Sequence, residues 1–79
     1  MLKKAKYNIS GKNIKSIRLK KNISQEDLAI KLQLKGIKFT PSTISKIESE
    51  DRSVSDKELL AFSQVLNVSL EELILKKHL

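Results

Sequence analysis

One short pattern recurs five times along this chain and limits it to a bundle of short helices. Each copy has an apolar residue, then Ser or Thr, then a second apolar residue four positions after the hydroxyl. A hydroxyl before a helix accepts from an unpaired backbone N–H, and the two apolar residues pack together as a hydrophobic staple. The copies are 14 to 16 residues apart and begin at Ile9-Ser10, Ile23-Ser24, Phe39-Thr40, Val54-Ser55 and Val68-Ser69. No stretch alternates in the manner of a strand, so the pattern predicts five helices.

Signals within and after these helices support the same division. Three starts carry an acid at the third helical position, as a capping box requires: Asp27, Glu58 and Glu72. Residues that tolerate a left-handed backbone follow three helices: Asn22, Gly36 and Asn67. The apolar helix faces predict a single core made of Ile14, Ile17, Leu28, Ala29, Leu32, Ile44, Ile47, Leu59, Phe62, Val65, Leu66, Leu70, Leu73 and Ile74.

The charge of the chain is strongly uneven. The formal net charge is +7 over 79 residues, but residues 1–21 carry +8, residues 22–47 carry +2 and residues 48–79 carry −3. Ordinary solubility charge is one explanation. A basic face for a polyanion is the other, because phosphate contacts supply most sequence-independent affinity for DNA.

Residues 24–47 hold the most informative pair of helices. Ser24 opens a helix over about residues 25–35, and Thr40 opens another over about 41–49. Pro41 suits the first helical position of the second, where its missing N–H is not needed. Two short helices this close, in a basic chain, indicate a helix-turn-helix whose second helix enters a DNA groove.

Several motifs along the chain resemble a known family. They are I-K-S-I-R at 14–18, I-S-Q-E-D-L-A at 23–29, S-T-I-S-K-I-E at 42–48, Arg52, and V-L-N-V-S-L-E-E-L at 65–73. In these motifs the chain resembles the Cro and phage-repressor type of helix-turn-helix regulator, also called the Xre family. The resemblance implies an all-α, five-helix, lambda-repressor-like domain. It also implies binding of double-stranded DNA, and repression of transcription by a homodimer on a two-fold operator.

The resemblance assigns roles to individual residues. Base reading would fall to residues on or beside the exposed side of the third helix: Thr40, Pro41, Ser42, Thr43 and Lys46. Lys46 suits guanine O6 or N7, and hydroxyls can serve several bases. Ser42 and Thr43 have the alternative role of simply starting the helix. Contacts to phosphates would come from Gln25, Arg18 and Arg52. If the basic first helix also runs along phosphates, as its charge suggests, Lys12 and Lys15 would add further contacts.

Arg18 and Glu48 resemble a family ion pair that joins the first and third helices, with Arg18 near a phosphate. The alternative is that they are two unrelated surface charges. A partly buried pair of this kind fixes orientation more than it adds stability.

Two departures from the family lie beside the third helix. Gln33 stands where the family has glycine, and about five extra residues, including Gly36-Ile37-Lys38-Phe39, lengthen the connection to the third helix. We expect Phe39 to anchor this connection on the core, and Lys35 and Lys38 to become further phosphate contacts. After the third helix the family often has glycine, whereas Glu50 and Asp51 bring negative charge near the expected phosphates.

The two ends of the chain suggest further roles. Residues 1–9 are expected to form a basic flexible arm, with residues 10–79 as the DNA-binding domain. Ile74, Leu75 and Leu79 form an apolar strip that predicts a dimer interface, with core packing plus a frayed tail as the alternative. A protein partner, such as a toxin or an antirepressor, is the rival to operator binding on the same scaffold.

Other classes of function lack sequence support. The chain has no cysteine, and its single histidine, His78, stands one residue from the end. There is no glycine-rich phosphate loop and no carboxylate pair beside a base, so we expect no enzyme, metal or cofactor. No apolar run reaches membrane-spanning length, and no signal-peptide pattern heads the chain. We therefore expect a cytoplasmic protein without a membrane partner.

Overall fold

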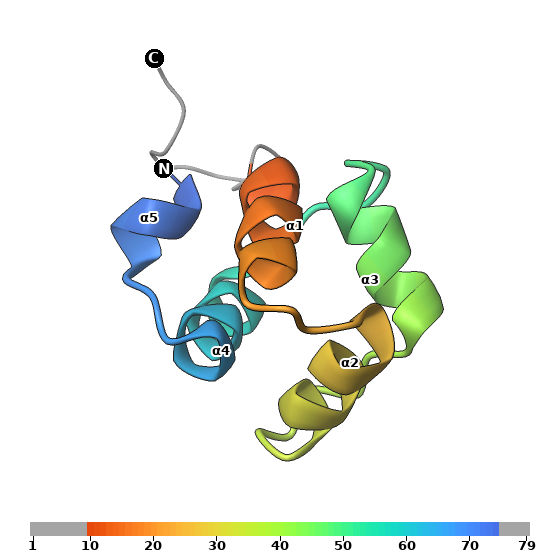
Figure 1. The fold of residues 1–79 in the computed structure, drawn as a ribbon. Coiled ribbons are helices and arrows are strands. Elements are labelled where there is room, and N and C mark those ends of the chain that lie inside the picture. The colour runs from red at the N-terminus through yellow and green to blue at the C-terminus, as the bar shows by residue number, and fades with distance from the viewer. Residues whose placement is uncertain (1–9, 75–79) are drawn as a thin grey trace.

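The computed structural model describes residues 10–74, apart from the side chain of Ser10, and within that range the chain is entirely helical and contains no strand. The five helices are α1 (Ser10–Lys20), α2 (Gln25–Gln33), α3 (Pro41–Glu48), α4 (Asp56–Leu66) and α5 (Leu70–Ile74). The expected all-α, five-helix fold is therefore confirmed. α1 lies between α3 and α5, with α2 and α4 beside its C-terminal end (Figure 1). The expected arm at 1–9, Leu75 and Leu79 fall outside the described residues.

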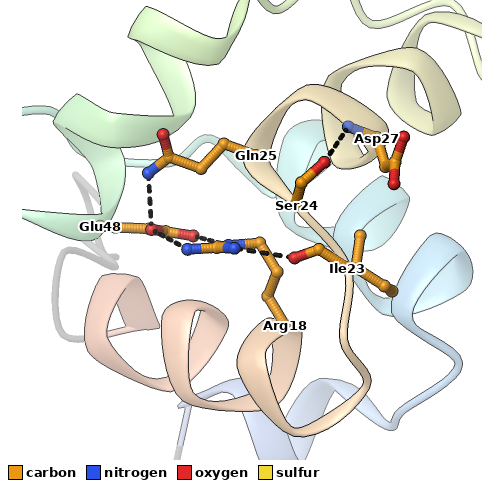
Figure 2. Close-up of polar contacts among 6 residues, drawn as sticks. All are labelled: Arg18, Ile23, Ser24, Gln25, Asp27 and Glu48. Carbon is orange, nitrogen blue, oxygen red and sulfur yellow. Dashed lines mark hydrogen bonds and ion pairs between the residues drawn. The ribbon is translucent and has the colours of Figure 1, made fainter.

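Hydroxyl caps start the helices as the pattern predicts. Ser24, Thr40 and Ser55 each accept a hydrogen bond from the backbone N–H at the third helical position. Ser55 and Glu58 complete a reciprocal capping box, and Ser69 and Glu72 exchange the same pair of bonds. The box expected at Asp27 is only half formed, because its amide donates to Ser24 while its carboxylate points away (Figure 2). Electrostatic attraction to the helix N-terminus is sufficient reason for an acid in this turn.

A Schellman motif ends each of the first four helices. In each, a residue one to three positions after the helix adopts a left-handed backbone: Asn22 (φ 57°), Gly36 (φ 88°), Glu50 (φ 67°) and Asn67 (φ 58°). At Gly36, for example, the Ile37 amide donates to the Leu32 carbonyl and the Gly36 amide to the Gln33 carbonyl. Sequence signals indicate three of these ends. Glu50 is missed because a glutamate rarely adopts this conformation.

The core is the one that the helical faces indicate, with one error and four additions. Leu70 was expected inside but is 42% exposed, since the single turn of α5 centres its burial on Leu73. Ile17, Val65 and Ile74 are only partly buried and pack at its edge. The additional buried residues all lie outside the predicted faces: Ile37, Val54, Ala61, and Phe39, which was expected to anchor the connection on the core. No helix within residues 10–74 is long and apolar enough to cross a membrane.

The lengthened connection between α2 and α3 is packed rather than looped out. α2 ends at Gln33, two residues before the expected end, and residues 34–36 form a turn. Ile37 and Phe39 are buried, and the Gln33 side-chain amide donates to the Phe39 carbonyl at 3.2 Å. The Phe39 ring meets the Phe62 ring of α4 at a centroid distance of 6.0 Å. Phe39 thus anchors the connection immediately before α3 begins.

α1 touches the backbone of α3 at Gly11. A Cβ placed on Gly11 would lie 2.1 Å from the carbonyl oxygen of Ile47, a distance that no real side chain occupies. Glycine is needed here for close approach of two helices, while its backbone is ordinary helix. On the other side of α1, Asn13 donates to the Leu73 carbonyl at 2.7 Å and holds α5 on α1. These contacts fix α3 and α5 on opposite sides of α1.

Candidate nucleic-acid interface

α3 has one face in the core and the opposite face open to solvent. Ile44, Ile47 and Glu48 are buried, and their three- and four-residue spacing defines the inner side. The outer side carries exposed residues at the same spacing: Pro41, Ser42, Ser45 and Lys46. We call these four residues the α3 outer face. Ser45 was missed by sequence reasoning, although its position three residues after Ser42 would have identified it.

Thr40 and Thr43 have structural partners that limit them as base readers. The Thr40 hydroxyl caps α3 by accepting from the Thr43 amide at 3.2 Å, and the two hydroxyl oxygens lie 3.1 Å apart. Thr43 is also half-buried, while Thr40 is exposed beside the start of the helix. Of the five expected base-reading residues, Pro41, Ser42 and Lys46 are therefore the ones that the fold presents on the α3 outer face.

Arg18, Glu48 and Gln25 join three helices in one polar network (Figure 2). Nε and one terminal nitrogen of Arg18 donate to the two carboxylate oxygens of Glu48 at 2.7 and 3.0 Å. The other terminal nitrogen donates to the Ile23 carbonyl at 2.7 Å. Gln25 donates from its side-chain amide to Glu48 at 3.0 Å. This network fixes the start of α2 relative to the end of α3.

The geometry does not fit the expected phosphate contact of Arg18. Its side chain is only 8% exposed, and all three of its nitrogens already have partners in the network. The pair is structural: it satisfies two buried charges with each other and so avoids an unpaired charge in the interior. Gln25 is different, because it is half-buried and its side-chain nitrogen gives one of its two N–H groups to Glu48 and donates to no other group within residues 10–74, so the second N–H can donate to a phosphate.

The lysines expected at phosphates are all exposed but differ in position. Lys15 lies one turn from both Gly11 and Arg18, the α1 residues that face α3, so it flanks the α3 side of that helix. Lys12 lies about 100° around α1 from Gly11, on its solvent side. Lys35 and Lys38 lie in the anchored connection, within a few residues of the start of α3.

Arg52 has a partner that the sequence did not reveal. Its two terminal nitrogens donate to the carboxylate oxygens of Glu58 at 3.1 and 3.2 Å, and its guanidinium lies 4.9 Å from the centre of the Phe39 ring. Partial burial raises the pKa of Glu58, but hydrogen bonds from Arg52 and Ser55 and the charge of Arg52 outweigh it. The pKa is therefore lowered from its ordinary value of 4.5.

Negative charge gathers just after the C-terminal end of α3. Glu50 and Asp51 follow the helix, and the Asp51 carboxylate accepts from the Ser49 hydroxyl at 3.0 Å. The start of α3 is flanked instead by Lys35 and Lys38. The lysines before α3 and the acids after it thus make the start of the helix the more favourable end for a polyanion. Within residues 10–74 no three His, Cys, Asp or Glu side chains group as a metal site.

An exposed helix face, held by a buried network against a second helix in a basic domain, defines a helix-turn-helix DNA-binding domain. The family comparison agrees: a helix-turn-helix model matches residues 14–73. The match covers most of the chain, so the protein belongs to the Cro/C1-type helix-turn-helix family of DNA-binding regulatory domains, which are not typically enzymes. No curated protein and no solved structure matches the chain significantly.

Proposed function

We propose that this DNA-binding regulator reads specific double-stranded sequences with the α3 outer face in the major groove. One observation carries the proposal: α3 buries its apolar side completely and presents Pro41, Ser42, Ser45 and Lys46 together. Lys46 can donate to guanine, the serines can pair with several bases, and Pro41 can contact a thymine methyl group. Thr40 and Thr43 would contribute from beside this face.

Contacts to the phosphate backbone would orient that face. Gln25 stands at the first position of α2 with its side-chain nitrogen held by Glu48, and the second N–H of that nitrogen would donate to a phosphate oxygen. Lys15, Lys35 and Lys38 flank α3, and Lys12 would reach a phosphate further along the duplex. Each lysine that meets a phosphate contributes about 0.9 to the slope of log affinity against log salt. Lys15→Gln should therefore flatten this slope by that amount, and an unchanged slope would remove Lys15 from the interface.

We further propose a homodimer that represses transcription by occupying a two-fold operator in the cytoplasm. A dimer would place two α3 helices about one helical turn, roughly 34 Å, apart on one face of the DNA. Ile74 is only partly buried at the end of α5, and Leu75 and Leu79 continue the apolar strip in the sequence. Sedimentation of Leu75→Lys beside the parent tests the interface. Identical monomer masses for both would exclude it.

Selection of duplexes from a random pool tests the proposed function. The parent should enrich a two-fold motif, whereas Ser42→Ala/Lys46→Ala should enrich none or a degenerate one. The charge-matched control Lys57→Ala, on an exposed site of α4, should recover the parent motif. A pool that stays random with the parent would contradict sequence-specific binding.

A protein-interaction role, with a toxin or an antirepressor as partner, is the second candidate. The observation that favours it is an exposed apolar pair at the C-terminal end of α2: Ile30, in the last turn of the helix, is 53% exposed, and Leu34, the residue that caps it, is 83% exposed. If the parent enriches no duplex, and a purified toxin or antirepressor binds the parent but not Leu34→Lys, this role replaces operator binding. Failure of both experiments would exclude both functions.

A further inference from the structure

A single series of contacts ties both flanks of α3 to α4. Phe39 is the residue before the Thr40 cap, and Arg52 lies in the loop that follows the helix. The guanidinium of Arg52 covers one side of the Phe39 ring at 4.9 Å, while Phe62 of α4 meets the same ring at 6.0 Å. Arg52 also pairs through both terminal nitrogens with Glu58 of α4. We call Phe39, Arg52 and Glu58 the brace.

The brace restricts the extra backbone freedom that the longer connection between α2 and α3 introduces. A tight turn would fix the angle between two helices through its few backbone torsions, whereas each added residue brings two more soft torsions. Here Phe39 removes that freedom by packing, and Arg52 holds Phe39 from the solvent side. The guanidinium is well suited to this double task, because its face stacks on an aromatic ring while its edge donates two parallel hydrogen bonds to a carboxylate.

We propose that Arg52 is a positioning residue that sets the orientation of the α3 outer face through the brace, and thereby the discrimination between specific and non-specific DNA. The inference rests on the proposed function and assigns Arg52 a role other than phosphate contact. Lysine could supply the charge of Arg52, but it has neither a planar face to stack on an aromatic ring nor two parallel N–H donors for a carboxylate. The brace uses residues from three separated parts of the sequence, of which only Arg52 belongs to a family motif.

The two roles of Arg52 give opposite results for Glu58→Gln. If Arg52 contacts a phosphate, removing the carboxylate frees Arg52 and deletes a negative charge, so DNA affinity should rise. If Arg52 acts through the brace, Glu58→Gln should lower specific affinity roughly two- to fivefold, the range of a partly exposed ion pair. Arg52→Gln should lower it roughly three- to tenfold, because the cation–π interaction disappears as well. Glutamine at 58 can still complete the capping box with Ser55.

The experiment measures specific and non-specific affinity, each against salt, for both variants and for two charge-matched controls. Asp56→Asn is the control for Glu58→Gln, and Lys57→Gln for Arg52→Gln; both sites are exposed on α4. We expect both brace variants to lose specific affinity with an unchanged salt slope, while the controls retain the parent ratio. A salt slope flattened by about 0.9 in Arg52→Gln, or a higher affinity in Glu58→Gln, would overturn the proposal.

A second readout needs no DNA. The Thr43 amide donates to the Thr40 hydroxyl and the Ile44 amide to the Thr40 carbonyl, so hydrogen exchange at both reports how firmly α3 begins. Both brace variants should exchange faster there than the controls, relative to the Leu28 and Leu66 amides in neighbouring helices. Uniform exchange in all variants would overturn the brace. If the parent binds no specific duplex, the proposed function fails, and the exchange result still decides the brace.

Discussion

Replacing Glu48 by glutamine should destabilise the domain far more than its small change in shape suggests. The substitution keeps the volume but leaves the positive charge of Arg18 buried without a counter-charge. Glu48 accepts three hydrogen bonds, two from Arg18 and one from Gln25, at 2.7 to 3.0 Å. A glutamine amide can accept from one side only, so at least one buried donor loses its acceptor.

The expected loss is about 3–5 kcal/mol, the usual cost of removing one partner of a buried pair. A 79-residue domain has roughly 4–12 kcal/mol of total stability. The variant should therefore be marginal, with its thermal midpoint lowered by about 4–8 °C for each kcal/mol lost. Urea unfolding followed by circular dichroism measures the loss, and the exposed Glu26→Gln on α2 is the matched control.

A double variant separates charge burial from packing. Arg18→Met/Glu48→Leu removes both charges, so it should regain most of the stability that Glu48→Gln loses. It should still bind specific DNA poorly, because Gln25 no longer has the acceptor that orients it. A loss below about 1 kcal/mol in Glu48→Gln, equal to that of Glu26→Gln, would refute the reasoning.

Three further changes test other parts of the fold. Gly11→Ala should lower the free energy of unfolding, measured with urea, by about 1–3 kcal/mol, because the new Cβ meets the Ile47 carbonyl. An increase of about 1 kcal/mol in that free energy, as helix propensity alone implies, would contradict the close contact. Glu50→Gly should stabilise the domain by about 1 kcal/mol by relieving the left-handed backbone, and a loss would show that the side chain matters more. Because the folded pKa of Glu58 is lowered, its contribution is present above pH 4.5 and disappears as pH falls through the folded value. Unfolding curves below pH 4.5 should thus be less pH-dependent for Glu58→Gln than for the parent, and identical slopes would argue against the Arg52 pairing.

Local signals in the sequence predict most of the fold. Caps such as Ser24 and Thr40, and the left-handed residues Asn22 and Asn67, act within one helical turn, so their effect can be predicted from the adjacent residues in the sequence. The buried helix faces follow from periodicity in the same way. Glu50 is the exception: its left-handed backbone is imposed by the end of α3 and carries no local signature.

The site was less predictable because its geometry comes from contacts between distant segments. The sequence alone leaves Arg18 available to a phosphate, whereas the fold buries it between α1, α2 and α3. Arg52 stacks on Phe39 because the fold brings the connection before α3 beside the loop after it, and Arg52 also pairs with Glu58 of α4. No sequence signal marks Gly11 as necessary. The need for a glycine appears only in the fold, where the Ile47 carbonyl lies against this position.

The ratio of specific to non-specific affinity in Ser42→Ala/Lys46→Ala, measured on the duplex selected by the parent, tests the central claim most directly. Both side chains lie on the α3 outer face, outside the core, so the fold should be unaffected. Removing each base-reading side chain should cost about 1–3 kcal/mol of discrimination, so the ratio should fall at least tenfold relative to the parent and to Lys57→Ala. A folded double variant that keeps the parent ratio would show that α3 does not read the DNA.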